Sequence, residues 1–334
     1  MNVFVDSHHD ALFQFLRILF ERRLGWNLYK PIGYEWYRNL FWQYSKNDAT
    51  VDQYLKIPDE AELKDGVYYL PERRHNEIDK GITFEKFKEM KIDIVIASVV
   101  NHELPYKTLT ERHYNKPKFI RLIGNWGEPI DFNLSKNVLA TAKTVPIPEN
   151  INAVFCHQEF DTKIFKYQPP KVRKSIKNFM NCLPVSKDIA LWHQYRAKLP
   201  SLDWKMHGIL GKDGIIGTVD KMVPAIQAST FIWHVKPGGD GFGHVVHNAF
   251  ACGRPLITRK KYYQDKLAVE LMIDNKTVID LDSGSLADNL KRIAFFSEPE
   301  NHDKMCENCY NRFREVVDFD KEFEEIKEFL KNLQ

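Results

Sequence analysis

A glycine-rich segment holds the residues best suited to binding a charged ligand. It runs from Trp233 to Thr258 and reads WHVKPGGDGFGHVVHNAFACGRPLIT. An apolar run ends at His234, the glycines follow, and a helical pattern starts at Gly243. Loop glycines let backbone N–H groups approach a ligand, and the following helix N-terminus adds partial positive charge. With Lys236 beside it, the loop predicts a phosphate site, although such turns also serve packing alone.

The same segment resembles the donor-binding motif of GT-B-fold glycosyltransferases. It reads D-G-F-G-x-x-x-x-N-A-x-A-x-G-R-P-x-I, where the family pattern is E-G-F-G followed by E-A-x-A-x-G-x-P. Two acidic residues of the family contact the donor sugar and its ribose, and the resemblance carries these roles to Asp240 and Asn248. Both replace a family Glu, yet Asp accepts hydrogen bonds from hydroxyls and Asn accepts or donates them.

The resemblance implies an α/β protein with two Rossmann-like domains facing a central cleft, and a C-terminal helix that crosses back to the first domain. It implies sugar transfer from a nucleotide-diphosphate donor to an acceptor hydroxyl in that cleft, with retention and without a catalytic metal or further cofactor. Asp240 is a catalytic candidate. The implied donor-binding residues are Lys187, Lys236, Gly238, Gly239, Gly241, Phe242, Gly243, His244 and Asn248.

Lys187 is chosen by its place in the segment Asn181–Asp188. In the family, basic residues just after the first strand of the second domain bind the diphosphate, and no accompanying arginine is visible here. A departing nucleoside diphosphate builds negative charge, which a lysine stabilises. A solvated surface lysine is the alternative.

His8, His9 and Asp10 form the sharpest cluster in the first half of the chain. They separate a short apolar run, Asn2–Asp6, from a helical pattern. Ligands of open α/β sheets bind outside the carboxyl ends of the strands, so this loop should face the cleft. An imidazole there could take a proton from an acceptor hydroxyl, with Asp10 orienting it. Alternatively, Asp10 only caps the helix and one histidine packs internally.

Other polar groups follow the predicted strands of the first domain. His102-Glu103, Gly124-Asn125 and His157 each come after an apolar run and should point toward the same edge. A basic, aromatic stretch suits sugars or the bases and phosphates of a nucleic acid; in it, aromatic residues (Trp26, Tyr29, Tyr34, Trp36, Tyr37 and Trp42) are interleaved with Arg17, Arg22, Arg23, Lys30, Arg38 and Lys46. We interpret Gly25–Asp65 as an irregular insertion and expect the acceptor on the side of the basic, aromatic stretch; an ordinary amphipathic surface is the alternative.

The elements that position these residues alternate between strand and helix. Such alternation predicts an open sheet covered on both faces. Helices are expected over Gly243–Cys252, over Tyr263–Met272 and from Asp320 to the end. The expected strands are Asn2–Asp6, Ile92–Val100, Phe119–Ile123, Ala153–Cys156, Asp203–His207, Ser229–His234, Pro255–Thr258 and Val278–Leu281.

The length of 334 residues predicts two domains. The prolines in Tyr167–Lys171 mark a linker, since they break both helix and strand. We therefore expect an N-terminal acceptor-side domain over residues 1–168, a nucleotide-sugar-binding domain over 169–316, and a C-terminal helix over 317–334 that packs on the first.

Composition narrows the function classes. Apolar residues make up 43% and aromatic residues 13%, which indicates a packed globular protein. A net charge of +3 does not demand a nucleic-acid partner. The 5 cysteines form no disulfide framework, and Cys306 and Cys309, spaced C-x-x-C, lack a second pair for a metal site. No segment is apolar enough to span a membrane, and we expect a cytoplasmic protein.

The sequence is also compatible with other functions. A sugar-nucleotide epimerase would use the same fold and need no acceptor. The acceptor could be a glycan, a small molecule or a modified nucleic-acid base. Because both acidic family positions are substituted, an inactive nucleotide-sugar-binding protein is a further alternative. A Rossmann dehydrogenase is disfavoured, since no G-x-G-x-x-G follows the first strand.

Overall fold

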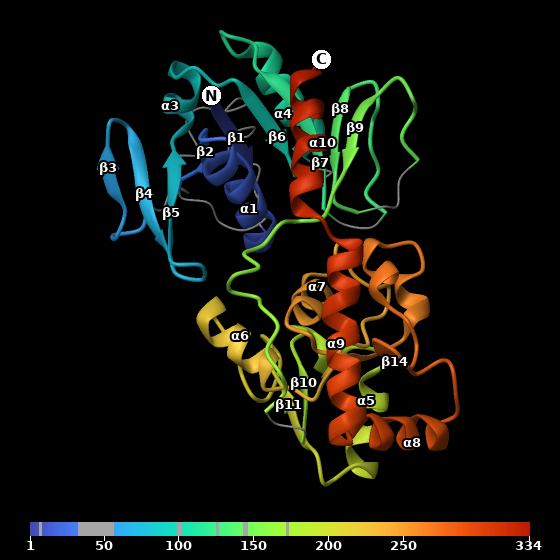
Figure 1. Cartoon of the computed structure of the whole chain (residues 1–334). Coiled ribbons are helices and arrows are strands. Elements are labelled where there is room, and N and C mark those ends of the chain that lie inside the picture. Colours follow the sequence, from blue (N-terminus) through green and yellow to red (C-terminus); the bar gives the residue numbers. More distant parts are fainter. Residues whose placement is uncertain (7–8, 33–56, 99–101, 125–126, 143–145, 172–173) are drawn as a thin grey trace. The chain divides into compact units, whose positions relative to one another are not determined.

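Two sheets organise the chain, one in each of two compact units. The first unit comprises Met1–Phe160 and Phe319–Gln334, and the second comprises Asp161–Asp318. The structure is a computed structural model (Figure 1), which describes residues 1–6, 9–32, 57–98, 102–124, 127–142, 146–171 and 174–334. No helix within these ranges is long and apolar enough to cross a membrane.

Within the described ranges, the first sheet has nine strands in the order β3-β4-β5-β2-β1-β6-β7-β8-β9. From β5 to β9 the neighbouring strands are parallel, whereas β3–β4 and β4–β5 are antiparallel pairs. The central strands are buried apolar runs, as in sheets covered on both faces. The strands are β1 (Asn2–Asp6), β2 (Asn27–Pro31), β3 (Glu62–Lys64), β4 (Val67–Glu72), β5 (Glu77–Ile82), β6 (Ile94–Ala97), β7 (Lys118–Ile123), β8 (Asn137–Ala140) and β9 (Asn152–Phe155).

Helices cover both faces of this sheet. On one face lie α1 (Asp10–Arg17), its π-helical continuation η1 (Ile18–Arg23) and α10 (Phe319–Lys331), whose apolar residues share a core with β1 and β6. On the other face lie α3 (Phe84–Glu89) and α4 (Glu103–Arg112). The C-terminal helix α10 thus belongs to the first unit, which confirms its predicted return.

The stretch from Gly25 to Asp65 is not irregular throughout, as the sequence had suggested. Its residues Asn27–Pro31 form β2, a parallel neighbour of β1. Leu28 and Tyr29 point to opposite faces and are both buried there, joining different cores. The strand was missed because its polar ends and aromatic flanks hide a two-residue apolar centre. Residues 33–56 lie outside the described ranges.

The second sheet has five parallel strands in the order β11-β10-β12-β13-β14. They are β10 (Ser175–Asn178), β11 (Asp203–Met206), β12 (Phe231–Trp233), β13 (Leu256–Thr258) and β14 (Val278–Asp280). The helices of this unit are α5 (Ile189–Lys198), α6 (Val219–Gln227), α7 (His244–Ala251), α8 (Leu286–Ser297) and α9 (Pro299–Val316). This open α/β sheet agrees with the predicted fold class.

The prediction of a helix over Tyr263–Met272 is wrong. Two short 3-10 turns stand there, η5 (Lys260–Tyr263) and η6 (Leu267–Leu271). Lys266 separates them with extended backbone and is itself buried, and its Nζ donates to the carbonyl of Tyr262 at 3.0 Å. The extended backbone at Lys266 is incompatible with a continuous helix across Tyr263–Met272.

The division between the units falls at Phe160 and Asp161, before the boundary expected at residue 168. Residues of the expected linker pack within the second unit. Tyr167 stacks on Tyr310 of α9 at 5.1 Å, and the carbonyl of Gln168 accepts from the buried Arg254 at 2.9 Å. The second division falls at Asp318, close to the expected residue 316.

Candidate functional site

The loops after the strands of the second sheet bring together most of the predicted donor-binding residues. Because all five strands are parallel, their carboxyl ends lie at one edge of the sheet, where open α/β sheets bind ligands. Lys187 follows β10, Asp240 follows β12 and Arg259 follows β13. The buried Trp233 packs against Trp192 and Trp204, which anchors the end of β12.

The glycine-rich loop adopts backbone conformations that its glycines permit. Gly238, Gly239 and Gly243 have φ of +80°, +67° and +85°, the left-handed region that side chains rarely adopt. A Cβ on Gly239 would lie 2.2 Å from the carbonyl oxygen of Tyr262, so this position excludes any side chain. Gly243 is the N-cap of α7, and Gly241 is buried within the loop. The backbone of the loop therefore leads directly into the N-terminus of α7.

Asp240 lies in this loop between two basic side chains. His234 Nε2 is 2.9 Å from Asp240 Oδ2, and Lys236 Nζ contacts Oδ1. Burial disfavours the charged carboxylate, but the hydrogen bond from His234 and the charge of Lys236 outweigh it and hold the pKa of Asp240 well below its usual range. The side chain is 21% exposed, so an ionised carboxylate reaches solvent here.

Asn248 lies on α7, behind the loop. Its Oδ1 is buried and has no hydrogen-bond partner among the described residues. A buried carbonyl oxygen of this kind is a ready acceptor for a hydroxyl. Phe242 is 2% exposed and stacks on His247 at 4.0 Å, with His244 edge-on to it at 4.8 Å. Phe242 thus supports the loop from beneath, and its ring presents almost no surface.

Lys187 is exposed, and its Nζ lies 5.8 Å from the ring centroid of Tyr262. The guanidinium of Arg259 lies 5.2 Å from the centroid of the same ring. The Tyr262 ring is therefore in contact with two cations, Lys187 and Arg259. Arg259 is held by Asp282 at 2.6 Å and by Asp188 at 3.4 Å. Burial and the hydrogen bond to Asp188 raise the pKa of Tyr262 to about 12, so its hydroxyl stays protonated.

Sequence reasoning missed two cations at this edge, Arg259 and Lys266. Burial lowers the pKa of Lys266, and the aliphatic part of its side chain lies against Gly239. Arg259 directly follows a predicted strand, Pro255–Thr258, and that position was a signal that could have found it. The sequence carried no such signal for Lys266, because the predicted helix over Tyr263–Met272 included it.

The first-unit candidates are only partly described. His8 lies outside the described residues. His9 is the exposed N-cap of α1, and its Nδ1 accepts from the backbone N–H of Leu12 at 3.4 Å. Asp10 lies 3.6 Å from Arg74 of the hairpin between β4 and β5. Because a neutral imidazole has one bare nitrogen, protonating His9 at Nδ1 would break this cap.

Two other histidines of the first unit lie beside carboxylates. The buried His102 has Nδ1 at 3.5 Å from Asp6 Oδ2, which also accepts from the hydroxyl of Tyr106 at 2.6 Å. His157 Nδ1 lies 2.5 Å from Glu322 on α10. These pairs tie β1 to α4 and β9 to α10, and they give the histidines structural roles.

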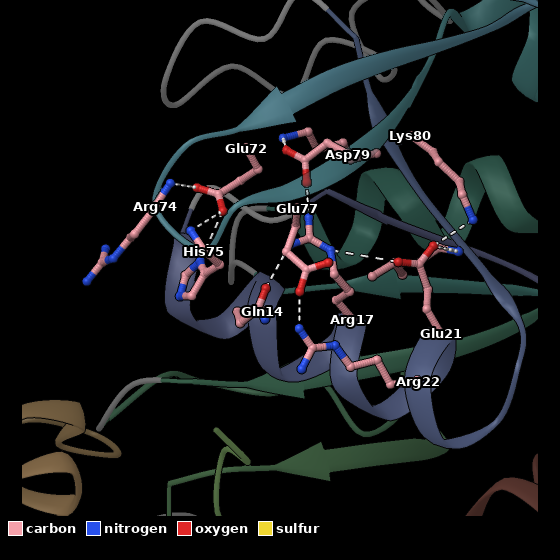
Figure 2. Close-up of polar contacts among 12 residues, drawn as sticks. Gln14, Arg17, Glu21, Arg22, Glu72, Arg74, His75, Glu77, Asp79 and Lys80 are labelled. Atoms are coloured by element: carbon pink, nitrogen blue, oxygen red, sulfur yellow. Dashed lines mark hydrogen bonds and ion pairs between the residues drawn. The ribbon is translucent and has the colours of Figure 1, made fainter. Parts of the chain in front are cut away.

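The described arginines of the basic, aromatic stretch are engaged by carboxylates. Figure 2 shows Arg17 and Arg22 of α1 and η1 reaching Asp79 and Glu77 of β5. Arg23 pairs with Glu159 at 2.8 Å. Because Arg17 is buried and Arg22 and Arg23 are paired with carboxylates, these three arginines do not favour a nucleic-acid interface. The members of the stretch that lie outside the described residues are Tyr34, Trp36, Tyr37, Arg38, Trp42 and Lys46.

Cys306 and Cys309 are buried thiols on α9. Cys309 Sγ donates to the carbonyl of Thr277 at 3.3 Å, and burial raises the pKa of its thiol well above the usual value. Across the described ranges, no three His, Cys, Asp or Glu side chains gather where they could hold a metal ion.

Comparison with known proteins finds similarity in structure alone. No family model and no curated protein matches the sequence. HepE from Anabaena, solved with UDP and glucose, matches with a TM-score of 0.65 at 11% identity over 99% of both chains. Sucrose-phosphate synthase from Thermosynechococcus elongatus matches at 0.64 and 11%, over 99% of this chain and 98% of that one. A glycosyltransferase from Rickettsia africae matches at 0.63 and 14%, over 99% of both. The chain thus has the two-domain fold of these glycosyltransferases, and the GT-B fold predicted from its sequence is confirmed.

Proposed function

We propose that this protein is a glycosyltransferase that moves a sugar from a nucleoside-diphosphate donor to an acceptor hydroxyl. The observation that carries the proposal is the segment after β12, in which Asp240 in the glycine-rich loop and Asn248 on α7 both offer an acceptor oxygen. A structure of the same fold was solved with UDP and glucose, which supports a nucleotide sugar as the ligand class.

Each part of the donor has a partner in the proposal. Asp240 accepts hydrogen bonds from sugar hydroxyls, and Asn248 Oδ1 accepts one from the ribose. Lys187 and Lys236 neutralise the diphosphate, with Arg259 holding the ring of Tyr262 beneath Lys187. The backbone of Gly238, Gly239, Gly241, Phe242, Gly243 and His244 surrounds the phosphates.

The reaction breaks the bond between the anomeric carbon and the diphosphate oxygen. Charge-assisted contacts to the leaving diphosphate stabilise the negative charge that builds on it. In our proposal lysines supply this charge in place of a metal ion. We further propose retention, in which the leaving phosphate takes the proton of the acceptor hydroxyl and no protein nucleophile forms.

The acceptor is assigned to the first unit. With an inverted product, a protein base would be required, and His8 or His9 with Asp10 is our candidate. At His9 this role competes with the helix cap, so His9→Ala separates the two roles. Loss of transfer with normal donor binding would establish the base, whereas normal transfer with lower stability would establish the cap.

Nucleotide-sugar binding without transfer is the second candidate function. It is favoured by the engagement of both Asp240 oxygens by His234 and Lys236. Turnover of the bound nucleotide sugar distinguishes the two. Release of nucleoside diphosphate, with water or an acceptor hydroxyl as the second substrate, supports transfer, and binding without release supports the second candidate. An epimerase would convert the sugar with donor alone.

A thermal-shift panel of UDP, GDP, ADP, CMP and their sugars tests donor binding. A ligand at 100 times its Kd adds about 2.7 kcal/mol to stability, which gives a clear shift. A selective shift that weakens in Asp240→Ala and Asn248→Ala is the expected result. Shifts that both variants retain would contradict the assigned contacts, and no shift at millimolar concentration would contradict the function.

A further inference from the structure

His234 is the first residue after β12, and its imidazole is almost completely buried. It is 1% exposed, and its Nε2 lies 2.9 Å from Asp240 Oδ2. The other ring nitrogen, Nδ1, is buried without a hydrogen-bond partner among the described residues. In the proposed transfer reaction, His234 has no role of its own.

The contact with Asp240 requires a hydrogen on Nε2 of His234, because an ionised carboxylate oxygen can only accept. The ring of the buried Tyr263, centred 6.0 Å away, packs beside the imidazole and limits its rotation.

Asp240 is therefore oriented before any ligand arrives. His234 holds Oδ2 from the end of the strand, and Lys236 contacts Oδ1 from the loop. Each carboxylate oxygen keeps a further lone pair, which can accept a hydroxyl hydrogen.

We propose that His234 is a positioning residue for the donor sugar, because its Nε2–H holds the Asp240 carboxylate in the orientation that accepts hydrogen bonds from sugar hydroxyls. This inference rests on the proposed function. It assigns His234 to recognition of the sugar and not of the nucleotide, since Asp240 is the group it holds.

Two amide substitutions separate the hydrogen bond from the bulk of the ring. The amide nitrogen of His234→Gln reaches the place of Nε2 and can donate to Asp240, whereas that of His234→Asn reaches only the place of Nδ1. His302 provides the matched control, because it is also buried in this unit and its Nε2 lies 2.8 Å from the carbonyl of Thr230, beside β12. His302→Asn removes a comparable bond away from Asp240.

The readout is the ratio of two dissociation constants measured by calorimetry, that of the nucleoside diphosphate over that of its nucleotide sugar. His234→Asn should lower this ratio about tenfold through the sugar term alone, as expected for one lost hydrogen bond to a charged group. His234→Gln and His302→Asn should keep the wild-type ratio. An unchanged ratio in His234→Asn, or equal weakening of both ligands, would overturn the inference.

A nitrogen NMR spectrum of the wild-type protein gives a second reading that needs no variant to fold. A hydrogen on Nε2 of His234 is expected, and the Nδ1-protonated tautomer, in which Nε2 is bare, would overturn the inference. If the wild type bound neither nucleotide nor nucleotide sugar, the proposed function would fail as well, which separates its failure from that of His234 alone.

Discussion

At the scale of single residues, Asn248 is distinguished by a buried oxygen that the described residues leave unbonded. We predict that Asn248→Leu keeps or raises the free energy of unfolding by up to about 1 kcal/mol, because it removes this oxygen and favours the helix. Donor affinity should fall about tenfold, as expected when one hydrogen bond with the ribose is lost. Urea unfolding and calorimetric titration measure the two effects.

Asn289 is the matched control for this substitution. It is a buried helical asparagine, whereas Asn248 is half-buried, and its Nδ2 donates to the hydroxyl of Tyr195 and the carbonyl of Leu281, both at 3.0 Å. Asn289→Leu should therefore destabilise the protein by about 1–3 kcal/mol, since it strands buried partners. Equal destabilisation by both variants, with donor affinity intact in Asn248→Leu, would refute the assigned role.

At the scale of elements, the glycine-rich loop depends on close backbone contact. Gly238 and Gly239 both have positive φ, but only Gly239 has the carbonyl of Tyr262 within 4 Å of an added Cβ. Gly238→Ala should cost about 1–2 kcal/mol from backbone strain alone. Gly239→Ala should cost more and weaken donor binding about tenfold or further, because the loop must move away from η5. Titration of each variant with the donor measures the difference in affinity. Equal affinities of the two variants would contradict the proposed role of the loop in donor binding.

In the hairpin between β4 and β5, Glu72 makes the free energy of unfolding depend on pH. Burial disfavours the charged form of Glu72, but the side chain of His75 and the backbone N–H groups of Arg74 and His75 lower its pKa to about 2. A carboxylate whose pKa is depressed in the folded state stabilises the fold above its unfolded pKa of about 4.3 and loses this effect as the pH falls toward 2.

Glu72→Gln should therefore destabilise the protein by about 1–3 kcal/mol between pH 5 and 7, and the difference from wild type should shrink below pH 4. Urea unfolding over a pH series measures this difference. Glu60→Gln, at an exposed partner of Arg73 in a neighbouring segment, should show almost none. A difference that stays constant down to pH 3 would disprove the role of Glu72.

Elements made of continuous apolar residues could be predicted from sequence, and those that depend on distant partners could not. β1, β7 and β13 lie close to their predicted bounds because the chain itself supplies their buried residues. β2 forms only because β1 and β5 provide hydrogen-bond partners on either side. The 3-10 turns around Lys266 arise where this lysine packs against Gly239, which lies earlier in the chain.

The candidate site divides in the same way. Asp240 and Asn248 lie in one continuous segment, the loop after β12 and helix α7, so the sequence alone showed their motif. Arg259 joins Lys187 only through the ring of Tyr262, and His234 acquires its role only through the geometry of Asp240. Sequence spacing does not encode such contacts between separate loops.

At the scale of the whole molecule, the last helix stabilises the unit that contains the first strand. Phe329 of α10 is buried in the core with Val3 and Ile94. Phe329→Ala should cost about 3–5 kcal/mol, and this cost should fall on the first unit. Hydrogen exchange should show lost protection in β1 and β6 while α9 keeps its protection. Equal loss in both units would contradict this division.

In our proposal a nucleotide sugar binds through Asp240 of the loop after β12 and Asn248 of α7. A crystal structure of the protein with the donor selected by thermal shift is the decisive experiment. We expect the diphosphate beside the backbone of Gly238–Gly243, a sugar hydroxyl within about 2.5–3.0 Å of the Asp240 carboxylate, and a ribose hydroxyl at Asn248 Oδ1. A nucleotide sugar bound elsewhere, or bound here without either side-chain contact, would refute the proposal.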